Sequence, residues 1–370
     1  MTDFMQAWQI SEKDFPRNGP SAEKLAFCVR YAVLAPSVYN TQPWHFSIDG
    51  NTLYLFADRR HALPVIDPDD RQQNMTCGAA LYNLRLAIRY FGYEETTELL
   101  PDPVNDSLLA RVKLGEKREG TAEEGLESLF KAIPKRHSNR GAFADKDVPD
   151  DILRKLQAAA ASEGAWLHIC PPVERKIVVG MIAEADRIQA SNKHFRRELA
   201  SWVDCRRRDS GDGMPGMGLS YHDVVKNLNP SPARRFSVDN KTATDEQLDS
   251  NSPVLAVLGS KAGGVLERMR SGQGLMRVLL QAEACGLAVS ALNQPCEVPE
   301  LRLVMHDEIS QQGRAQMILR IGYGGKATYT PRRALSEVLD FEGKSVSKNR
   351  KAANDGGQGL LGRVKGLFGK

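Results

Sequence analysis

The chain has no long apolar run and lacks several well-known catalytic motifs. No stretch approaches the ~20 apolar residues that a membrane-spanning helix needs. The first 19 residues, MTDFMQAWQISEKDFPRNG, are acidic and interrupted, unlike an export signal, so we expect a protein of the cytoplasm. There is no GxSxG elbow, no HExxH and no P-loop, and no GxGxxG opens a helix after a strand. The commonest hydrolase, zinc-protease and nucleotide-binding signatures are therefore excluded.

Cysteine is scarce and scattered. The sequence has six cysteines, with no CxxC pair and no His/Cys spacing typical of metal ligands. We therefore expect free, buried thiols, with neither a disulfide framework nor a metal site.

Positive and negative charges nearly cancel over most of the chain. The formal net charge is +4, but residues 344–370 hold seven Lys/Arg against one Asp, which leaves −2 for the rest. A body with this balance is not expected to bind nucleic acid. The Gly-rich tail, residues 344–370, ends in GLLGRVKGLFGK, with apolar residues at helical spacing beside basic ones. It is either a solvated terminus or a short basic helix that contacts an anionic membrane or a partner.

The order of predicted elements is clear in the first third of the chain. With 370 residues and 41 % hydrophobic content, the chain has room for about two domains of ~150 residues. The pattern predicts a capped helix over residues 21–35, strands over 45–49 and 52–58, a helix over 74–93 and a strand over 108–114.

A fainter copy of this order follows. A helix and a strand are expected within residues 149–170, with Trp166 in the place of Trp44, then a helix over 272–289 and a strand over 316–324. Two glycines 14 residues apart bracket each long helix, Gly78 and Gly92 in the first and Gly272 and Gly286 in the second. Two interpretations stay open, namely tandem similar halves resembling a fused dimer and two unrelated α+β domains.

A long polar insertion separates elements of the second half. Residues 204–252 are rich in Gly, Pro, Ser and charge, and are far longer than an ordinary connection. Such an insertion is usually a functional lid or a disordered segment. We favour a lid because the insertion carries apolar residues that could cover a pocket, namely Met214, Met217, Leu219, Tyr221 and Phe236.

Two motifs carry arginines that could bind an anion. RHSNRGAF, residues 136–143, places Arg136, Ser138 and Arg140 at alternate positions, and in an extended segment these would share one side. Arginine forks bind phosphate oxygens in pairs, so a phosphate site is one interpretation and a solvated charged loop is the other. Arg332 and Arg333 in YTPRRALSEVL, residues 329–339, could close the same site.

Four segments together resemble the nitroreductase-like flavoproteins: LAPSVYNTQPWHF, RHSNRGAF, GLAVSALNQP, and IGYG with TPRR. The similarity runs from about residue 21 to residue 339 and is greatest with the Acg-type branch, in which a lid covers the flavin. It implies an α+β, three-layer α-β-α fold, with two tandem halves forming an intramolecular pseudo-dimer. The implied divisions are a first half over 1–125, a second half over 126–340 that contains the lid at about 204–252, and a flexible basic tail over 341–370.

The resemblance also implies an FMN site. In this interpretation the turn after the first helix presents Pro36, Ser37 and Asn40 to the flavin, with Gln42 and Trp44 bracing it. Phosphate and ribityl oxygens would be held by Arg136, Ser138, Arg140, Arg332 and Arg333. Ser290, Ala291 and Leu292 would run beside the ring, unless they form an ordinary strand after a helix that ends at Gly286. The corresponding turn of the second half lacks proline, asparagine and glutamine, so we expect a single complete site.

The implied activity is that of a ping-pong oxidoreductase. NADPH or NADH would reduce the bound FMN, and a small-molecule acceptor such as a nitroaromatic or quinone would then take up the electrons. No protein side chain is assigned a catalytic role. The alternative is a flavin-sequestering protein whose lid shields the ring, and a third option is a flavin-free interaction protein that works through its basic tail. The chain is expected as a monomeric pseudo-dimer or a higher homo-oligomer.

Overall fold

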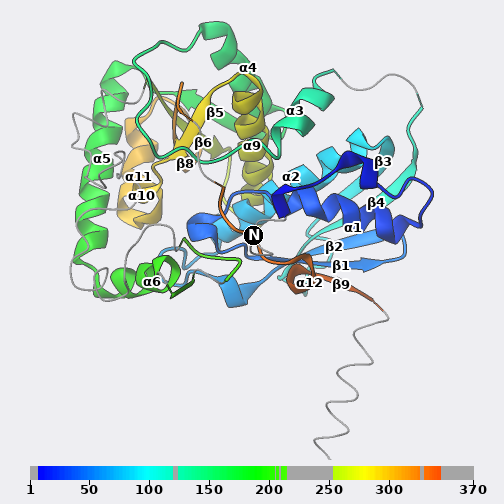
Figure 1. The fold of residues 1–370 in the computed structure, drawn as a ribbon. Helices are drawn as coiled ribbons and strands as arrows, with labels where there is room; N and C mark the ends of the chain where they lie inside the picture. Colours follow the sequence, from blue (N-terminus) through cyan, green and yellow to red (C-terminus); the bar gives the residue numbers. More distant parts are fainter. Residues whose placement is uncertain are drawn as a thin grey trace, which may run out of the picture.

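The computed structural model describes residues 7–119, 124–204, 206–207, 210–214, 253–325 and 329–342. It contains two separate sheets, one of five strands in the order β3-β4-β2-β1-β9 and one of four in the order β5-β6-β8-β7 (Figure 1). The chain contains both helices and strands, and every described strand pair except β1 with β9 is antiparallel, so the prediction of an α+β fold is confirmed. None of the described helices is both long and apolar enough to cross a membrane. The predicted basic tail, residues 344–370, and most of the predicted lid lie outside the described residues.

The first sheet packs against helices on one face. Its elements are η2 (Glu12–Asp14), α1 (Ser21–Ala32), η3 (Val38–Asn40), β1 (Trp44–Asp49), β2 (Thr52–Ala57), η4 (Arg59–His61), α2 (Arg71–Tyr90), β3 (Tyr93–Leu99), β4 (Leu108–Lys117), α3 (Leu126–Ala132), α12 (Leu335–Val338) and β9 (Leu339–Phe341). Strands β1 and β2 alternate between buried side chains such as Phe46 and Leu53, which face α1 and α2, and partly exposed ones. This alternation is typical of a sheet covered on one side.

The second sheet is covered on both faces, giving three layers. Its elements are α4 (Asp150–Ala161), β5 (Ala165–Ile169), α5 (Pro172–Ser191), α6 (Lys193–Val203), β6 (Val254–Ser260), α9 (Val265–Ala284), β7 (Ala288–Ala291), α10 (Gln294–Glu297), α11 (Pro299–Glu308) and β8 (Arg314–Gly322). Every residue of β6 is buried. Ala256 and Leu258 pack toward α4 and α9, whereas Leu255 and Val257 pack toward α5.

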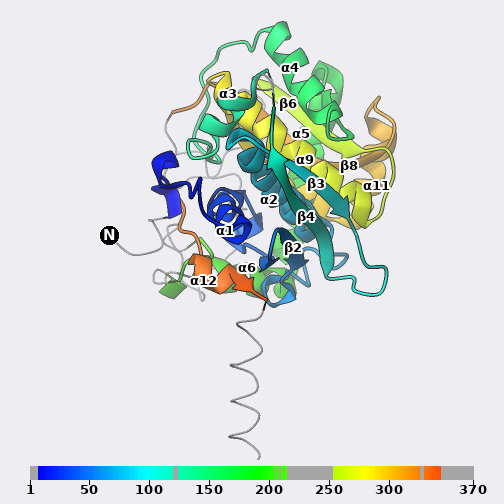
Figure 2. The same cartoon turned by 90° about the vertical axis from the view of Figure 1, so that its right-hand side faces the viewer.

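Two of the three described helices of 20 residues, α2 and α9, cross at the centre of the molecule (Figures 1 and 2). The predicted glycine pairs have different roles from those expected. Gly78 and Gly272 lie inside the helices and face each other at the crossing, where a Cβ on Gly272 would stand 2.0 Å from the carbonyl oxygen of Met75. Gly92 and Gly286 end their helices with φ of 85° and 73°, a conformation that glycine adopts without strain.

The end of the chain returns to the first sheet. Strand β9 pairs in parallel with β1, with Phe46 opposite Leu339. Helix α3 also packs into the first core through Leu129 and Phe130. The predicted division at residue 125 therefore separates segments that pack together, and the boundaries stay a prediction.

Several predicted boundaries were displaced or elements missed. The first long helix begins at Arg71 rather than residue 74, and the second runs over Val265–Ala284 rather than 272–289. Residues 288–291, expected partly as helix, form strand β7. Strand β3 and helices α5 and α6 had no counterpart in the predicted order. The five cysteines in the described part of the chain are free, as predicted.

Candidate functional site

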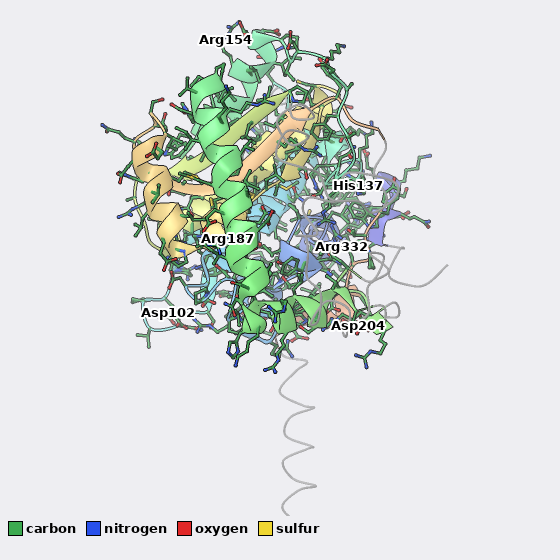
Figure 3. All side chains as sticks on the ribbon, turned by 90° about the vertical axis from the view of Figure 1, so that its left-hand side faces the viewer. Asp102, His137, Arg154, Arg187, Asp204 and Arg332 are labelled. Atoms are coloured by element: carbon green, nitrogen blue, oxygen red, sulfur yellow. The ribbon has the colours of Figure 1, made fainter. Side chains whose placement is uncertain are left out.

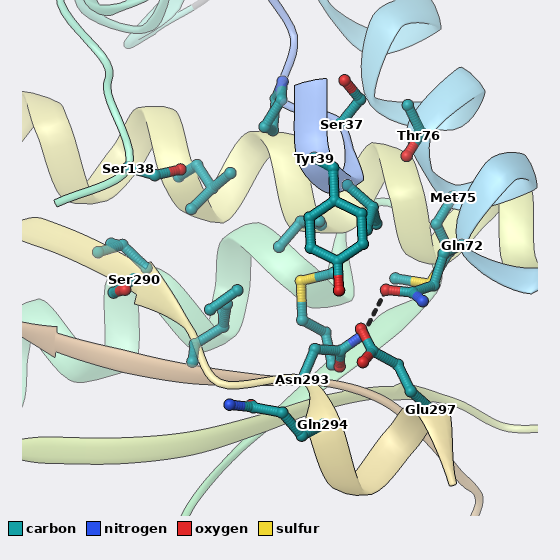
Figure 4. Close-up of a pocket in the computed structure, with 18 of the residues that line it drawn as sticks. Ser37, Tyr39, Gln72, Met75, Thr76, Ser138, Ser290, Asn293, Gln294 and Glu297 are labelled. Carbon is teal, nitrogen blue, oxygen red and sulfur yellow. Dashed lines mark hydrogen bonds between the residues drawn. The ribbon is translucent and has the colours of Figure 1, made fainter. Parts of the chain in front are cut away.

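A cavity of about 160 Å³ lies where the first half's turn meets the second sheet. Its walls come from the turn after α1, helices α2, α5, α9 and α10, and strand β7. The lining includes Pro36, Ser37, Val38, Tyr39, Gln72, Met75, Thr76, Ser138, Arg140, Gln189, Met214, Leu275, Leu279, Val289, Ser290, Ala291, Asn293, Gln294 and Glu297 (Figure 4). Both halves of the chain are needed to enclose it.

The turn at residues 36–42 is strained. Tyr39, Asn40 and Gln42 have φ of 49°, 58° and 51°, in the left-handed region that disfavours residues other than glycine. Gln42 donates from Nε2 to the carbonyl of Gly211 at 2.7 Å and accepts at Oε1 from the backbone N–H of Arg333 at 3.0 Å. These distant contacts hold a conformation that the turn would not keep alone.

Asn40 faces away from the cavity. Its Nδ2 donates to the carbonyls of Gly213 and Pro331, and its Oδ1 accepts from Arg332 at 3.1 Å. Within the turn, Pro36 and Ser37 line the cavity, whereas Asn40 and Gln42 brace the turn from behind. Tyr39, which the sequence interpretation did not single out, points its ring into the cavity (Figure 4).

The expected alternation in RHSNRGAF begins only at Ser138. Arg136 still belongs to the turn that follows α3, because its N–H bonds to the carbonyl of Ala132. From Ser138, which bridges to Val289 of β7, the segment is extended, so Ser138 and Arg140 face the cavity together. Arg140 is exposed, and its Nη2 donates to the sulfur of Met214 at 3.3 Å.

Arg136 and Arg332 form a buried cationic pair behind the turn. They are 5 % and 2 % exposed, and both donate to the carbonyl of Leu34, which adjoins the cavity-lining Pro36 and Ser37 by sequence. Neither makes an ion pair in the described part of the chain, and the Nε of Arg136 has no hydrogen-bond partner there. Burial lowers the pKa of Arg136 to about 10, and burial together with Arg136 lowers the pKa of Arg332 to about 9. Both remain charged at neutral pH.

An aromatic group packs on this pair. The ring of Trp8 lies 4.5 Å from that of His137 and 5.3 Å from that of Tyr329, and the Arg332 guanidinium stacks on Trp8 at 4.7 Å. Burial and the charges of Arg136 and Arg332 lower the pKa of His137 to about 4, so His137 is neutral at pH 7.

Arg333 differs from its neighbour because it has carboxylate partners. Its Nη1 lies 3.5 Å from Asp58 and its Nε lies 3.6 Å from Glu337. Its charge is therefore compensated within the protein, whereas that of Arg332 is not. Sequence alone left the choice between the two arginines open.

The three residues predicted to run beside the flavin ring, Ser290, Ala291 and Leu292, do not all face the cavity. Ser290 and Ala291 line the cavity, whereas Leu292 is buried in the core between the second sheet and α5. The residues just beyond, Gln294 and Glu297, also line the cavity. Gln294 belongs to the motif GLAVSALNQP but was not singled out, and Glu297 lies two residues beyond the end of that motif.

A second polar cluster lies away from the cavity. One ligand atom each from His168, Cys170 and Glu174 lies within 4.8 Å of the others, a spacing not predicted from the sequence. His168 is bonded to Glu174 at 2.6 Å, and the other carboxylate oxygen of Glu174 accepts from the N–H of Ser310 at 3.1 Å. These two hydrogen bonds provide a partner for each oxygen of the Glu174 carboxylate without a metal ion.

No protein-family model matches the chain. The chain is 30 % identical over 329 residues to a Mycobacterium tuberculosis protein named as an NAD(P)H nitroreductase, Rv3131, covering 87 % of this chain and 92 % of that protein. It is 24 % identical over 320 residues to the M. tuberculosis protein named as the NAD(P)H nitroreductase acg, covering 85 % of this chain and 95 % of that one.

Solved nitroreductases are more distantly similar. The FMN-dependent nitroreductase NfnB from Mycobacterium smegmatis, in complex with NADPH, is 13 % identical with a TM-score of 0.38, and covers 57 % of this chain and 96 % of its own. A nitroreductase with bound FMN from Bacteroides fragilis is 13 % identical with a TM-score of 0.32, and covers 56 % of this chain and 93 % of its own.

Proposed function

Since the chain belongs to the NAD(P)H nitroreductase family of its mycobacterial relatives, we propose that it binds FMN between its halves and acts as an NAD(P)H-dependent oxidoreductase. Family membership was predicted from four motifs and is confirmed by 30 % identity over 87 % of the chain. The cofactor, the acceptor and the order of the reaction go beyond that membership and are proposals.

The buried pair of Arg136 and Arg332 carries this proposal. Two buried guanidinium groups that make no ion pair in the described part of the chain favour an anion beside them, although Glu283 acts on Arg136 and Arg332 also donates to protein acceptors such as the carbonyl of Val33. Both touch the backbone of the turn whose next residues line the cavity. A ligand with a phosphate at this pair and its remainder in the cavity would satisfy both features.

The other cofactor contacts follow from the cavity walls. Ser138 and Arg140 would hold polar atoms of the flavin or ribityl chain, and Pro36 and Ser37 would lie on one side with Ser290 and Ala291 on another. Of the predicted pair, Arg332 rather than Arg333 is proposed for the phosphate. Asn40 and Gln42 are proposed to act indirectly by holding the turn.

FMN supplies hydride and electron transfer when it is bound, so the residues need only bind, orient and exclude water. Nitroaromatics or quinones are proposed as acceptors, with NAD(P)H and acceptor using the same cavity in turn. At about 160 Å³ the cavity is smaller than the roughly 300 Å³ or more of typical ligand pockets. Tyr39 and Met214 stand in it, so their side chains are proposed to move when ligands enter.

A lid over residues 204–252 and the halves at 1–125 and 126–340 are part of the same proposal. The described start of the insertion supports a lid beside the cavity. Gly211 accepts from Gln42, and the N–H of Gly213 donates to the carbonyl of Asn40 at 3.2 Å.

The first test is an absorbance spectrum of the purified protein under anaerobic conditions, with NADPH and then NADH added. We expect flavin bands that bleach with either donor. Bands that yield only to dithionite would instead support the flavin-sequestering alternative, in which the lid shields the ring. A colourless protein that FMN cannot reconstitute would contradict both.

Arg136→Met provides a sharper test, with Arg154→Met as the matched control on an exposed part of α4, far from Arg332 (Figure 3). Removing an uncompensated buried charge should leave the flavin-free protein as stable or more stable. Losing a charged phosphate contact should weaken FMN binding about 10- to 100-fold. A variant that is destabilised yet binds FMN normally would assign Arg136 a structural role instead.

A further inference from the structure

One end of the cavity is polar, and Glu297 is the single carboxylate among the described residues that line it. Glu297 ends helix α10 and faces the cavity together with Gln72, Asn293 and the ring of Tyr39. Figure 4 shows the Tyr39 hydroxyl pointing toward the Glu297 carboxyl and the two amides. The opposite end, where Figure 4 shows Ser138 and Ser290, is the one assigned above to the cofactor.

The Glu297 carboxyl is held in place by amides rather than by a cation. Gln189 of α5 donates from Nε2 to Oε2 of Glu297 at 2.8 Å, and Asn293 donates to Gln72 at 2.6 Å beside it. Within the described residues Glu297 makes no ion pair. The nearby guanidinium of Arg71 is instead bonded to the carbonyl oxygens of Cys296 and Gln316.

The surroundings keep a substantial fraction of the Glu297 carboxyl protonated near neutral pH. Burial, with a smaller contribution from Asp67, raises the pKa of Glu297 to about 7 against the opposing effects of Gln189, Arg71 and Gln72. The other titratable groups facing this end are Tyr39, whose own pKa burial and Glu297 raise, together with Asp186, Glu198 and Arg140 around Tyr39. A neutral carboxyl with one oxygen bonded and its cavity face open is suited to give up a proton.

We propose that Glu297 is the proton donor to the acceptor molecule, and that acceptors bind with the oxygen to be protonated directed at Glu297. This inference rests on the proposed function. It narrows the substrate class to compounds that gain a proton on oxygen when reduced, such as quinones and nitro compounds.

The reaction balances with the reductant already proposed. A quinone that receives one hydride, supplied by the reduced flavin of the proposed function, and one proton, from Glu297, becomes a hydroquinone. The O–H bond of Glu297 breaks, and a new O–H bond forms on the acceptor. The Glu297 carboxylate then regains a proton from solvent before the next turnover.

The first experiment needs no flavin. Infrared difference spectra of the protein as isolated, from about pH 5 to about pH 9, should show a protonated-carboxyl band that disappears as the pH rises through about 7. Glu297→Gln should remove this band, and Glu300→Gln, an exposed position on α11, should keep it. A spectrum without the band in the unsubstituted protein would overturn the inference even if FMN binds normally.

The second experiment measures quinone reduction by the FMN-loaded protein. For the unsubstituted protein we expect kcat to fall as the pH rises through about 7, because the donor proton is lost. Glu297→Gln should lower kcat about 100-fold near pH 6 and remove that dependence. Glu300→Gln should change neither. A Glu297→Gln variant that keeps the full rate and the same pH profile would overturn the inference while leaving the proposed function intact.

Discussion

The two halves use the same helix, turn and strand unit in different ways. In the first half, the turn between α1 and β1 holds three non-glycine residues at positive φ and lines the cavity. In the second half, Ser162–Gly164 join α4 to β5, and the single residue at positive φ is Gly164. A short turn with one glycine is locally stable, whereas the strained turn needs partners from the C-terminal segment and the start of the insertion. The site lies in the unit whose shape depends on distant contacts.

The largest expected effect concerns what the halves share, which is the crossing of α2 and α9. A Cβ on Gly272 would approach a backbone oxygen of Met75 to 2.0 Å, and one on Gly78 would approach Met269 to 2.3 Å. Gly272→Ala should therefore lower the free energy of unfolding by about 2–4 kcal/mol, measured by urea denaturation. Gly180 lies at an exposed position of α5, and nothing lies within 4 Å of where its Cβ would be, so Gly180→Ala should be neutral or stabilising. Equal losses at both positions would mean that the helices do not cross at Gly272.

The next prediction tests the partners of the strained turn. Gln42→Leu leaves the carbonyl of Gly211 and the N–H of Arg333 without these hydrogen bonds. We therefore expect the free energy of unfolding to fall by about 1–3 kcal/mol and FMN binding to weaken. Gln157→Leu removes a comparable amide in the second half's unit, where Gln157 is exposed and bonds to Leu167 at 3.2 Å. Gln157→Leu should change the free energy of unfolding by no more than about 0.5 kcal/mol. Similar losses for both would remove the contrast between the turns.

The second half's turn should be sensitive only at its glycine. Gly164 has φ of 81°, so Gly164→Ala should lower the free energy of unfolding by on the order of 1 kcal/mol without affecting FMN binding. Gly263→Ala, where φ is not positive and nothing lies within 4 Å, is the control and should be nearly neutral. Thermal unfolding and flavin titration of both variants would check this, and a loss of flavin in Gly164→Ala would show that the second turn also supports the site.

The smallest expected effect concerns the protonation of His61, in η4 near the turn of the first half. Burial alone would lower the pKa of His61, but hydrogen bonds to Asp212 and Asp58 outweigh it and raise the pKa. The stabilisation by protonated His61 is complete below its ordinary pKa of about 6.5 and is lost as the pH rises through the raised value. We therefore expect the unfolding free energy to decline with rising pH above about 6.5, and His61→Gln to flatten this decline. The same slope in His61→Gln would assign it to another group.

Much of the site was predictable because local patterns place side chains. Alternation in an extended segment brings Ser138 and Arg140 to one side, and the strand after a helix brings Ser290 and Ala291 to the cavity wall. Arg136 was predicted to join them but is still in the preceding turn. Glu297 was not identified because it lies just beyond the motif and is hydrogen-bonded by Gln189, more than 100 residues earlier in the chain.

The sequence by itself determined the α+β class, the existence of the long helices α2 and α9, and the family. These depend on periodicity and short motifs, which act over a few residues. Only the tertiary structure decided that Arg332 lacks a carboxylate while Arg333 has two, that Asn40 faces away from the cavity, and that Glu297 meets Tyr39 inside it. Charge compensation and burial depend on distances between segments far apart in the chain, and those distances exist only once both halves have packed together.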